Sequence, residues 1–148
     1  MNIQTILVPC DFSQNSEAGI NYAMELARKF DAEIVLAHVS PSAASLVIYG
    51  PGPAHLPRDL EDAVLAGVEQ GFANTRRSFA ESDRVSNVHL RGEPHAELVR
   101  YANDEPVDLI VMSTHGHTGL RHMVLGSVAE RVVRAALCPV ITVKPQPA

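Results

Sequence analysis

Short runs of almost uninterrupted apolar residues alternate along the chain with stretches in which apolar residues recur every three or four positions. The apolar runs predict five strands, at Ile3–Pro9, Ile34–Val39, Val85–Leu90, Val107–Met112 and Val140–Val143. The helical spacing predicts four amphipathic helices, at Ile20–Phe30, Leu60–Phe79, Pro94–Ala102 and Val124–Ala136. Strands without polar alternation are typical of a parallel sheet that helices cover on both faces.

The alternation of strands and helices predicts one doubly wound α/β domain over residues 1–148. Helix starts are also marked: Ser13 or Ser16 can cap the first helix, and Pro94 suits a first helical turn. Residues 127–130 read Ser-x-x-Glu, which predicts a capping box at the last helix. The segment from Ser40 to Pro57 is rich in proline and glycine, and we expect either a lid or a tolerated surface insertion there.

Composition narrows the class of protein. A net charge of −5 argues against a nucleic-acid partner, because phosphate backbones require a basic surface. No apolar stretch reaches the roughly 20 residues that span a bilayer, and no secretory signal begins the chain, so we expect a cytoplasmic protein without a membrane partner. Cys10 and Cys138 form no disulfide framework, and we expect Cys10 to be a buried apolar residue.

Candidate chemistry gathers where strands end. In parallel sheets, ligands bind beyond the carboxyl ends of the strands, at the point where the winding direction reverses. There the first strand supplies Asp11, and residues 113–119 form a loop of small and hydroxyl-bearing residues. Gly126 and Ser127 then open the last helix, whose free amide groups suit phosphate oxygens. Taken alone, a Gly-Ser pair at this place is more often only a helix cap.

The sequence resembles the universal stress protein family over essentially its whole length. Residues 6–13, Ile-Leu-Val-Pro-Cys-Asp-Phe-Ser, are similar to the family's first strand and turn, and residues 138–143 to its closing strand. Residues 108–120 and 125–132 resemble its signature block. Family members that bind ATP carry Gly-x2-Gly-x9-Gly-Ser/Thr. Gly116, Gly126 and Ser127 match that motif here, whereas Ser113 stands at its first glycine.

The resemblance implies strand order 3-2-1-4-5, a homodimer joined through the last strand (Val140–Val143) and an adenine nucleotide, ATP or AMP, in each subunit. By position, Asp11 and the main chain of Val39 would contact adenine, with Pro9 lining the pocket. The remaining implied contacts are Met112 and Ser113 along the ribose, and Gly116, Gly126, Ser127 and Val128 at the phosphates. Ser113 either hydrogen-bonds the sugar or first phosphate, or weakens binding.

Three functions stay open. We favour a nucleotide-responsive regulatory module; the alternatives are a slow ATPase or autophosphorylating enzyme, and a family member that has lost its nucleotide. Residues 113–128 contain no lysine and only one arginine, Arg121, so we expect Mg²⁺, held by the phosphates, to compensate a triphosphate. The histidines at 115, 117 and 122 lack a nearby cysteine or carboxylate, which disfavours a protein metal site.

Overall fold

The computed structural model describes residues 2–42, 58–114 and 125–145. The strands are β1 (Thr5–Pro9), β2 (Glu33–Ser40), β3 (Val85–Arg91), β4 (Leu109–Ser113) and β5 (Val140–Val143). A short 3-10 helix, η1 (Gln14–Ser16), precedes α1 (Glu17–Phe30). The other described helices are α3 (Arg58–Arg76), α4 (Pro94–Asp104) and α5 (Ser127–Ala135).

The five strands form one parallel sheet in the order β3-β2-β1-β4-β5, which confirms the expected topology. β1 is central: Pro9 at its carboxyl end lies opposite Ala37 of β2, and Leu7 lies opposite Ile110 of β4. The chain therefore winds away from β1 in both directions. The carboxyl ends of β1 and β4 meet at the point where that direction reverses.

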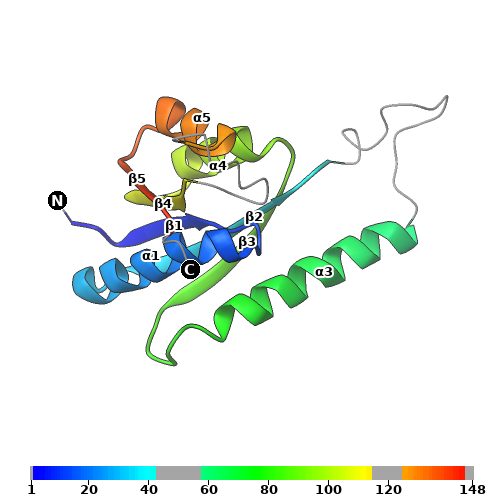
Figure 1. Cartoon of the computed structure of the whole chain (residues 1–148), viewed down its shortest axis with the longest axis horizontal. Coiled ribbons are helices and arrows are strands. Elements are labelled where there is room, and N and C mark those ends of the chain that lie inside the picture. The colour runs from blue at the N-terminus through cyan, green and yellow to red at the C-terminus, as the bar shows by residue number, and fades with distance from the viewer. Residues whose placement is uncertain (1, 43–57, 115–124, 146–148) are drawn as a thin grey trace.

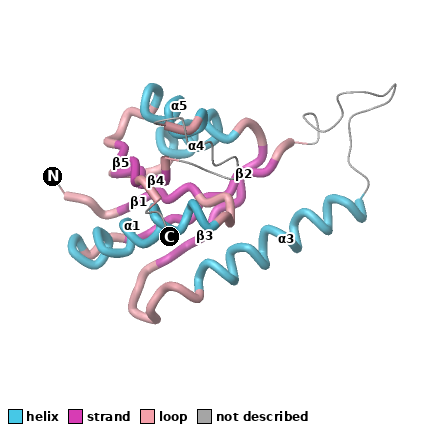
Figure 2. The backbone as a smooth tube through the Cα atoms, in the orientation of Figure 1, coloured by secondary structure: helices cyan, strands magenta, loops and turns pink. Residues whose placement is uncertain are grey.

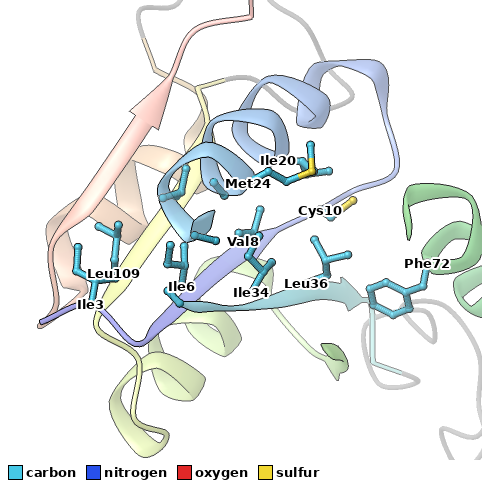
Figure 3. Packing of buried hydrophobic residues seen from close by; sticks show 14 of the residues in the cluster. Ile3, Ile6, Val8, Cys10, Ile20, Met24, Ile34, Leu36, Phe72 and Leu109 are labelled. Carbon is cyan, nitrogen blue, oxygen red and sulfur yellow. The ribbon is translucent and has the colours of Figure 1, made fainter. Parts of the chain in front are cut away.

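Helices cover both faces of the sheet, α4 and α5 on one side and α1 and α3 on the other (Figures 1 and 2). Figure 3 shows the core beneath α1, where alternate residues of β1 and β2 such as Val8 and Leu36 meet Ile20. The intervening residues of the same strands, such as Leu7 and Ala37, pack against α4 and α5. Burial of both strand faces explains why the sequence reads as unbroken apolar runs.

The structure corrects two predicted helix starts. Ser16 is the N-cap residue of α1, but neither its side chain nor that of Ser13 makes a capping hydrogen bond. At α5 the N-cap residue is Gly126, and Ser127 is already the first helical residue, so the predicted capping box is wrong. The Glu130 carboxylate instead pairs with Arg134 one turn further on, at 3.0 Å.

Some element ends also differ from the predictions. α3 ends at Arg76 rather than at Phe79, and β4 begins at Leu109 rather than at Val107. Asp108, which precedes β4, accepts hydrogen bonds from the amides at positions 4 and 5 through its carboxylate. No helix in the described parts of the chain combines the length and the apolar character needed to cross a membrane. Most of the predicted Ser40–Pro57 segment lies outside the described residues.

Candidate functional site

A cavity of about 310 Å³ opens at the carboxyl ends of β1, β2 and β4. Eight of the nine sequence-predicted site residues line it: Pro9, Asp11, Val39, Met112, Ser113, Gly126, Ser127 and Val128. The ninth, Gly116, lies outside the described residues, as do the three loop histidines and Arg121. The structure therefore brings residues from three distant stretches of sequence to one concave surface.

The cavity is also lined by residues that the sequence analysis did not assign to it. Pro94 and Leu98 come from the first two turns of α4, and Ala129 comes from the first turn of α5. Ser16 and Thr114, both buried, also line it, as do His38 and Cys10. The periodic apolar residues of this helix predict that Leu98 is buried. The same periodicity does not predict that Leu98 lines this cavity.

The β1 wall, residues 9–16, is held by hydrogen bonds among its own polar groups. The Asp11 carboxylate accepts from the amide of Ser13 at 3.0 Å and from its hydroxyl at 2.5 Å. The carbonyl of Ser13 in turn accepts from the amide of Ser16 at 3.1 Å and from the Ser16 hydroxyl at 2.7 Å. These bonds fix the direction of the carboxylate before any ligand is present.

Packing forces an unusual backbone conformation beside Asp11. Phe12 lies in the left-handed region, with φ of 61°, which is uncommon for a bulky residue. Its ring stacks on His38 at a centroid distance of 4.3 Å and meets the edge of Phe72 at 5.3 Å. Gly71 permits this packing, because a Cβ there would come within 2.6 Å of the Phe12 ring. The aromatic contacts stabilise the turn that presents Asp11 to the cavity.

Two further side chains, His38 and Cys10, lie beside the β1 wall. His38 donates from Nδ1 to the carbonyl of Cys10 at 2.8 Å, because a carbonyl oxygen can only accept. Cys10 is a buried free cysteine, as predicted. Burial raises the pKa of its thiol. Hydrogen bonds with Phe12, Ser16 and Thr75 lower the pKa, but by less than burial raises it. A protonated, buried thiol is a poor nucleophile, so Cys10 acts here as a packing residue.

The α5 wall, residues 126–129, has the opposite character. The Gly126 amide donates to the carbonyl of Thr114 at 2.6 Å, which fixes the start of α5 against the end of β4. Within the described parts of the chain, the amides of Ser127, Val128 and Ala129 have no hydrogen-bond acceptor. These first-turn donors, together with the Ser127 hydroxyl, can bind an anion.

Charged side chains are scarce at this surface. Among the described lining residues, Asp11 is the only carboxylate, and none is lysine or arginine. The described residues also contain no group of three or more His, Cys, Asp or Glu side chains that could hold a metal ion. The cavity therefore combines one oriented acceptor, an apolar floor and a cluster of backbone donors.

Comparison with known proteins gives this arrangement its context. The model of the Universal stress protein family matches residues 2–144. Universal stress protein MJ0531 of Methanocaldococcus jannaschii is 35% identical over 141 residues, covering 94% of this chain and 81% of that protein. The solved structure of MJ0577 superposes with a TM-score of 0.82 at 26% identity, covering 100% of both chains.

A second solved structure has the same fold. It is the universal stress protein from Archaeoglobus fulgidus in complex with dAMP, with a TM-score of 0.65 at 24% identity, covering 97% of this chain and 100% of that one. The family match spans nearly the whole chain and includes every described strand and helix. The chain belongs to the universal stress protein family.

Proposed function

We propose that this protein binds an adenine nucleotide in the cavity and acts as a nucleotide-responsive regulatory module. One observation carries the proposal: a single cavity joins an oriented carboxylate at one wall to three backbone amides without described acceptors at the other. A cavity of about 310 Å³ is at the lower end of the roughly 300–1,000 Å³ typical of small-molecule sites.

The phosphate end of the proposed site is the α5 wall. Three amides converge on the mouth of α5, where the helix dipole adds a partial positive charge. Gly126 has no side chain there, which allows an anion to approach the main chain. Since the Gly126 amide already donates to Thr114, the phosphate would be bound by Ser127 and Val128, with Gly126 supplying space. Gly116 is assigned to the same end by the family resemblance alone.

The adenine end is formed by Asp11, Pro9 and the main chain of Val39. A carboxylate accepts hydrogen bonds only, so Asp11 favours a base edge that carries an amino group. Met112, which is buried against α4 and α5, would lie along the ribose with the backbone of Ser113. The two ends of the cavity match the two ends of a nucleotide. The base is apolar and carries an amino group that can donate to Asp11, and the phosphate is an anion that can accept from the α5 amides.

The relatives support a nucleotide of this class. The universal stress protein from Archaeoglobus fulgidus has been solved with dAMP bound, which is an adenine nucleotide with one phosphate. We propose AMP or ATP for this chain. The described lining contains no lysine or arginine. The negative charge of ATP would therefore be compensated by Mg²⁺ that the phosphates themselves coordinate.

We favour binding over catalysis. Phosphoryl transfer requires an oriented nucleophile and cations that stabilise charge on the transferred group. Asp11 is held at the adenine end by Ser13, and the described lining contains no lysine or arginine. A slow ATPase remains the alternative function. A phosphate-release assay that gives turnover in the wild type and none in Gly126→Asp protein would support it.

We further propose a cytoplasmic homodimer that pairs through β5, so that nucleotide binding can alter dimer geometry. β5 is an edge strand, and its four residues are only partly buried. Leu137 just before it is 85% exposed, and Val133 on α5 is 45% exposed. Leu137→Glu should therefore shift the protein toward monomer in sedimentation experiments. Leu60→Glu, at an exposed leucine of α3, is the matched control and should leave the oligomeric state unchanged.

The primary test is the identity of a co-purified or titrated ligand. Protein purified under native conditions should release AMP, ADP or ATP that mass spectrometry identifies, at close to one nucleotide per chain. Calorimetry on protein stripped of ligand should then give saturable binding of AMP. A protein that neither releases nor binds any adenine compound would contradict the proposed function.

A further inference from the structure

Ser113, the residue at the expected position of the motif's first glycine, makes two hydrogen bonds within the protein through its side chain. Its hydroxyl donates to the carbonyl of Asn15 at 2.6 Å and accepts from the amide of Gly19 at 3.1 Å. Both partners are more than ninety residues away in sequence and lie in η1 and α1. The hydroxyl therefore joins the end of β4 to the start of α1.

This bond supplies the helix cap that local sequence does not. Gly19 is the third residue of α1, so its amide has no acceptor within the helix. The N-cap residue Ser16 makes no capping hydrogen bond with its side chain, and Ser113 accepts from that amide instead. The approach requires glycine, because a Cβ at Gly19 would lie 2.9 Å from the Ser113 nitrogen and 3.2 Å from its hydroxyl oxygen.

Hydrogen bonds continue from this junction to the cavity. Asn15, whose carbonyl accepts from Ser113, is the middle residue of η1, and Ser16 is its last. The amide and hydroxyl of Ser16 both donate to the carbonyl of Ser13. Ser13 in turn donates twice to the Asp11 carboxylate. Ser113 on one side of the cavity is thus linked to Asp11 on the other through η1.

The strand alternation of β4 explains why this serine does not fill the cavity. Leu109 and Val111 pack into the core beneath α1, whereas Ile110 and Met112 pack against α4 and α5. Ser113 continues the first set, and its hydroxyl bonds to α1 and η1 confirm that direction. A serine at this position is therefore compatible with a ligand on the α4 and α5 side.

We infer that Ser113 is a positioning residue for the adenine end of the site: its hydroxyl holds η1 against β4 and so fixes the Asp11 carboxylate. This role rests on the proposed function. It replaces both expectations for Ser113 from the sequence, direct contact with the sugar or phosphate and obstruction of the site. The hydroxyl already donates once and accepts once inside the protein.

Calorimetry with adenosine and with inorganic triphosphate tests the role, using Ser113→Ala and Ser113→Gly. Each variant loses the two hydrogen bonds, so adenosine affinity should fall by about three- to tenfold. Triphosphate affinity should stay within about twofold, because the α5 wall is untouched. Ser86→Ala, which removes a hydroxyl bonded to Glu33 at the other end of the sheet, is the matched control and should bind both probes like the wild type.

A double-mutant cycle separates positioning from general destabilisation. If Ser113 acts through Asp11, Ser113→Ala should reduce adenosine affinity less in an Asp11→Asn background than in the wild type. Equal losses in the two backgrounds would contradict the role. Higher adenosine affinity in Ser113→Gly would also contradict it, because that result means that the serine obstructs the ligand.

Hydrogen exchange provides a readout that needs no ligand. The Gly19 amide should exchange faster in unliganded Ser113→Ala protein than in the wild type, because it loses its acceptor. Unchanged protection of Gly19 would contradict the inferred link. Wild-type protein that binds no adenine compound would contradict the proposed function and the positioning role together. Wild-type binding with unaltered affinity in Ser113→Ala would contradict the positioning role alone.

Discussion

The two walls of the cavity are built on opposite principles. The polar groups of the β1 wall bond to one another, from Asp11 through Ser13 and Ser16. The α5 wall leaves the first-turn amides of Ser127 and Val128 without an acceptor in the described structure. The polar groups of one wall already satisfy one another, whereas the other wall carries donors that an anion would satisfy.

This difference indicates how affinity is divided between the two ends of a ligand. In the proposed function, preorganisation at the β1 wall would reduce the entropic cost of orienting a base and would give selectivity among bases. Unsatisfied donors at the α5 wall gain more from an anion, because each amide exchanges weak solvation for a charge-assisted hydrogen bond. We therefore expect changes at the α5 wall to affect phosphate-bearing ligands most strongly, and changes at the β1 wall to affect adenosine.

The largest expected effect comes from Gly126→Asp. The new carboxylate would face the proposed phosphate position, and like charges about 4 Å apart repel by roughly 4 kcal/mol at a surface-like dielectric. AMP affinity measured by calorimetry should fall by about a hundredfold or more. The fold should persist, because the φ of −69° at Gly126 is open to any residue and aspartate is a favourable N-cap residue.

Two matched variants isolate the charge at this position. Gly126→Asn has the same shape without the charge and should retain much more AMP affinity than Gly126→Asp. Gly67→Asp adds the same charge on α3, where a Cβ meets nothing within 4 Å, and should bind AMP like the wild type. Equal losses in Gly126→Asp and Gly126→Asn would show that size rather than phosphate charge governs this wall.

Asp11→Asn should have the next largest effect, at the other wall. Hydrogen bonds to a charged group contribute about 1.5–3 kcal/mol, so adenosine affinity should fall by roughly 10- to 100-fold. Inorganic triphosphate should bind as before. Asp59→Asn, an exposed carboxylate in the first turn of α3, is the control for net charge. Loss of triphosphate binding in Asp11→Asn would break the division between the two walls.

Removal of Mg²⁺ should weaken the binding of ATP much more than the binding of AMP. In EDTA, ATP affinity should fall by about tenfold or more relative to excess Mg²⁺, because the described lining has no lysine or arginine to compensate the added charge. AMP affinity should change by no more than about twofold. Calorimetric titration of both nucleotides under both conditions measures the contrast. Equal ATP binding with and without EDTA would show that the protein itself compensates the triphosphate.

The smallest expected effect lies away from both walls. Arg28 on α1 pairs with Asp83 through two hydrogen bonds, at 3.0 and 2.7 Å, and the guanidinium holds the pKa of that carboxyl below its ordinary value. Because the folded-state pKa is lowered, the pair stabilises the fold above the unfolded-state pKa, and this is lost as pH falls through the folded-state pKa.

Asp83→Asn should accordingly lower the melting temperature at neutral pH by about 1–4 °C. The difference from the wild type should begin to shrink as pH falls below about 4, the ordinary pKa of an aspartate in the unfolded chain. It should vanish once pH is below the lowered pKa of the folded-state carboxyl. Adenosine and AMP affinities should not change. A constant difference in melting temperature across this pH range would mean that the ion pair is not its source.

Much of the fold could be predicted from local patterns. Unbroken apolar strands such as residues 34–39 indicate two-sided burial, and that requires helices on both faces of the sheet. Eight of the predicted site residues line one cavity, because the carboxyl ends of parallel strands share an edge. What they bind stays a prediction until it is measured.

The remaining features depend on contacts between distant parts of the chain. Leu98 borders the cavity only because α4 crosses beside α5, which no local spacing encodes. The local sequence predicts that Ser13 or Ser16 caps α1, but Ser113 supplies the cap from β4. The left-handed turn at Phe12 follows from packing against His38 and Gly71. In each case a long-range contact overrides the local signal.

The most direct test is to record backbone amide NMR spectra while titrating AMP and, separately, adenosine. AMP should shift the amide signals of Ser127, Val128 and Ala129, whereas adenosine should shift those of residues 11–13 and Val39 and leave the start of α5 nearly unmoved. Saturating AMP that leaves the α5 amides unshifted, or equal perturbation of them by the two ligands, would contradict phosphate binding at the α5 wall.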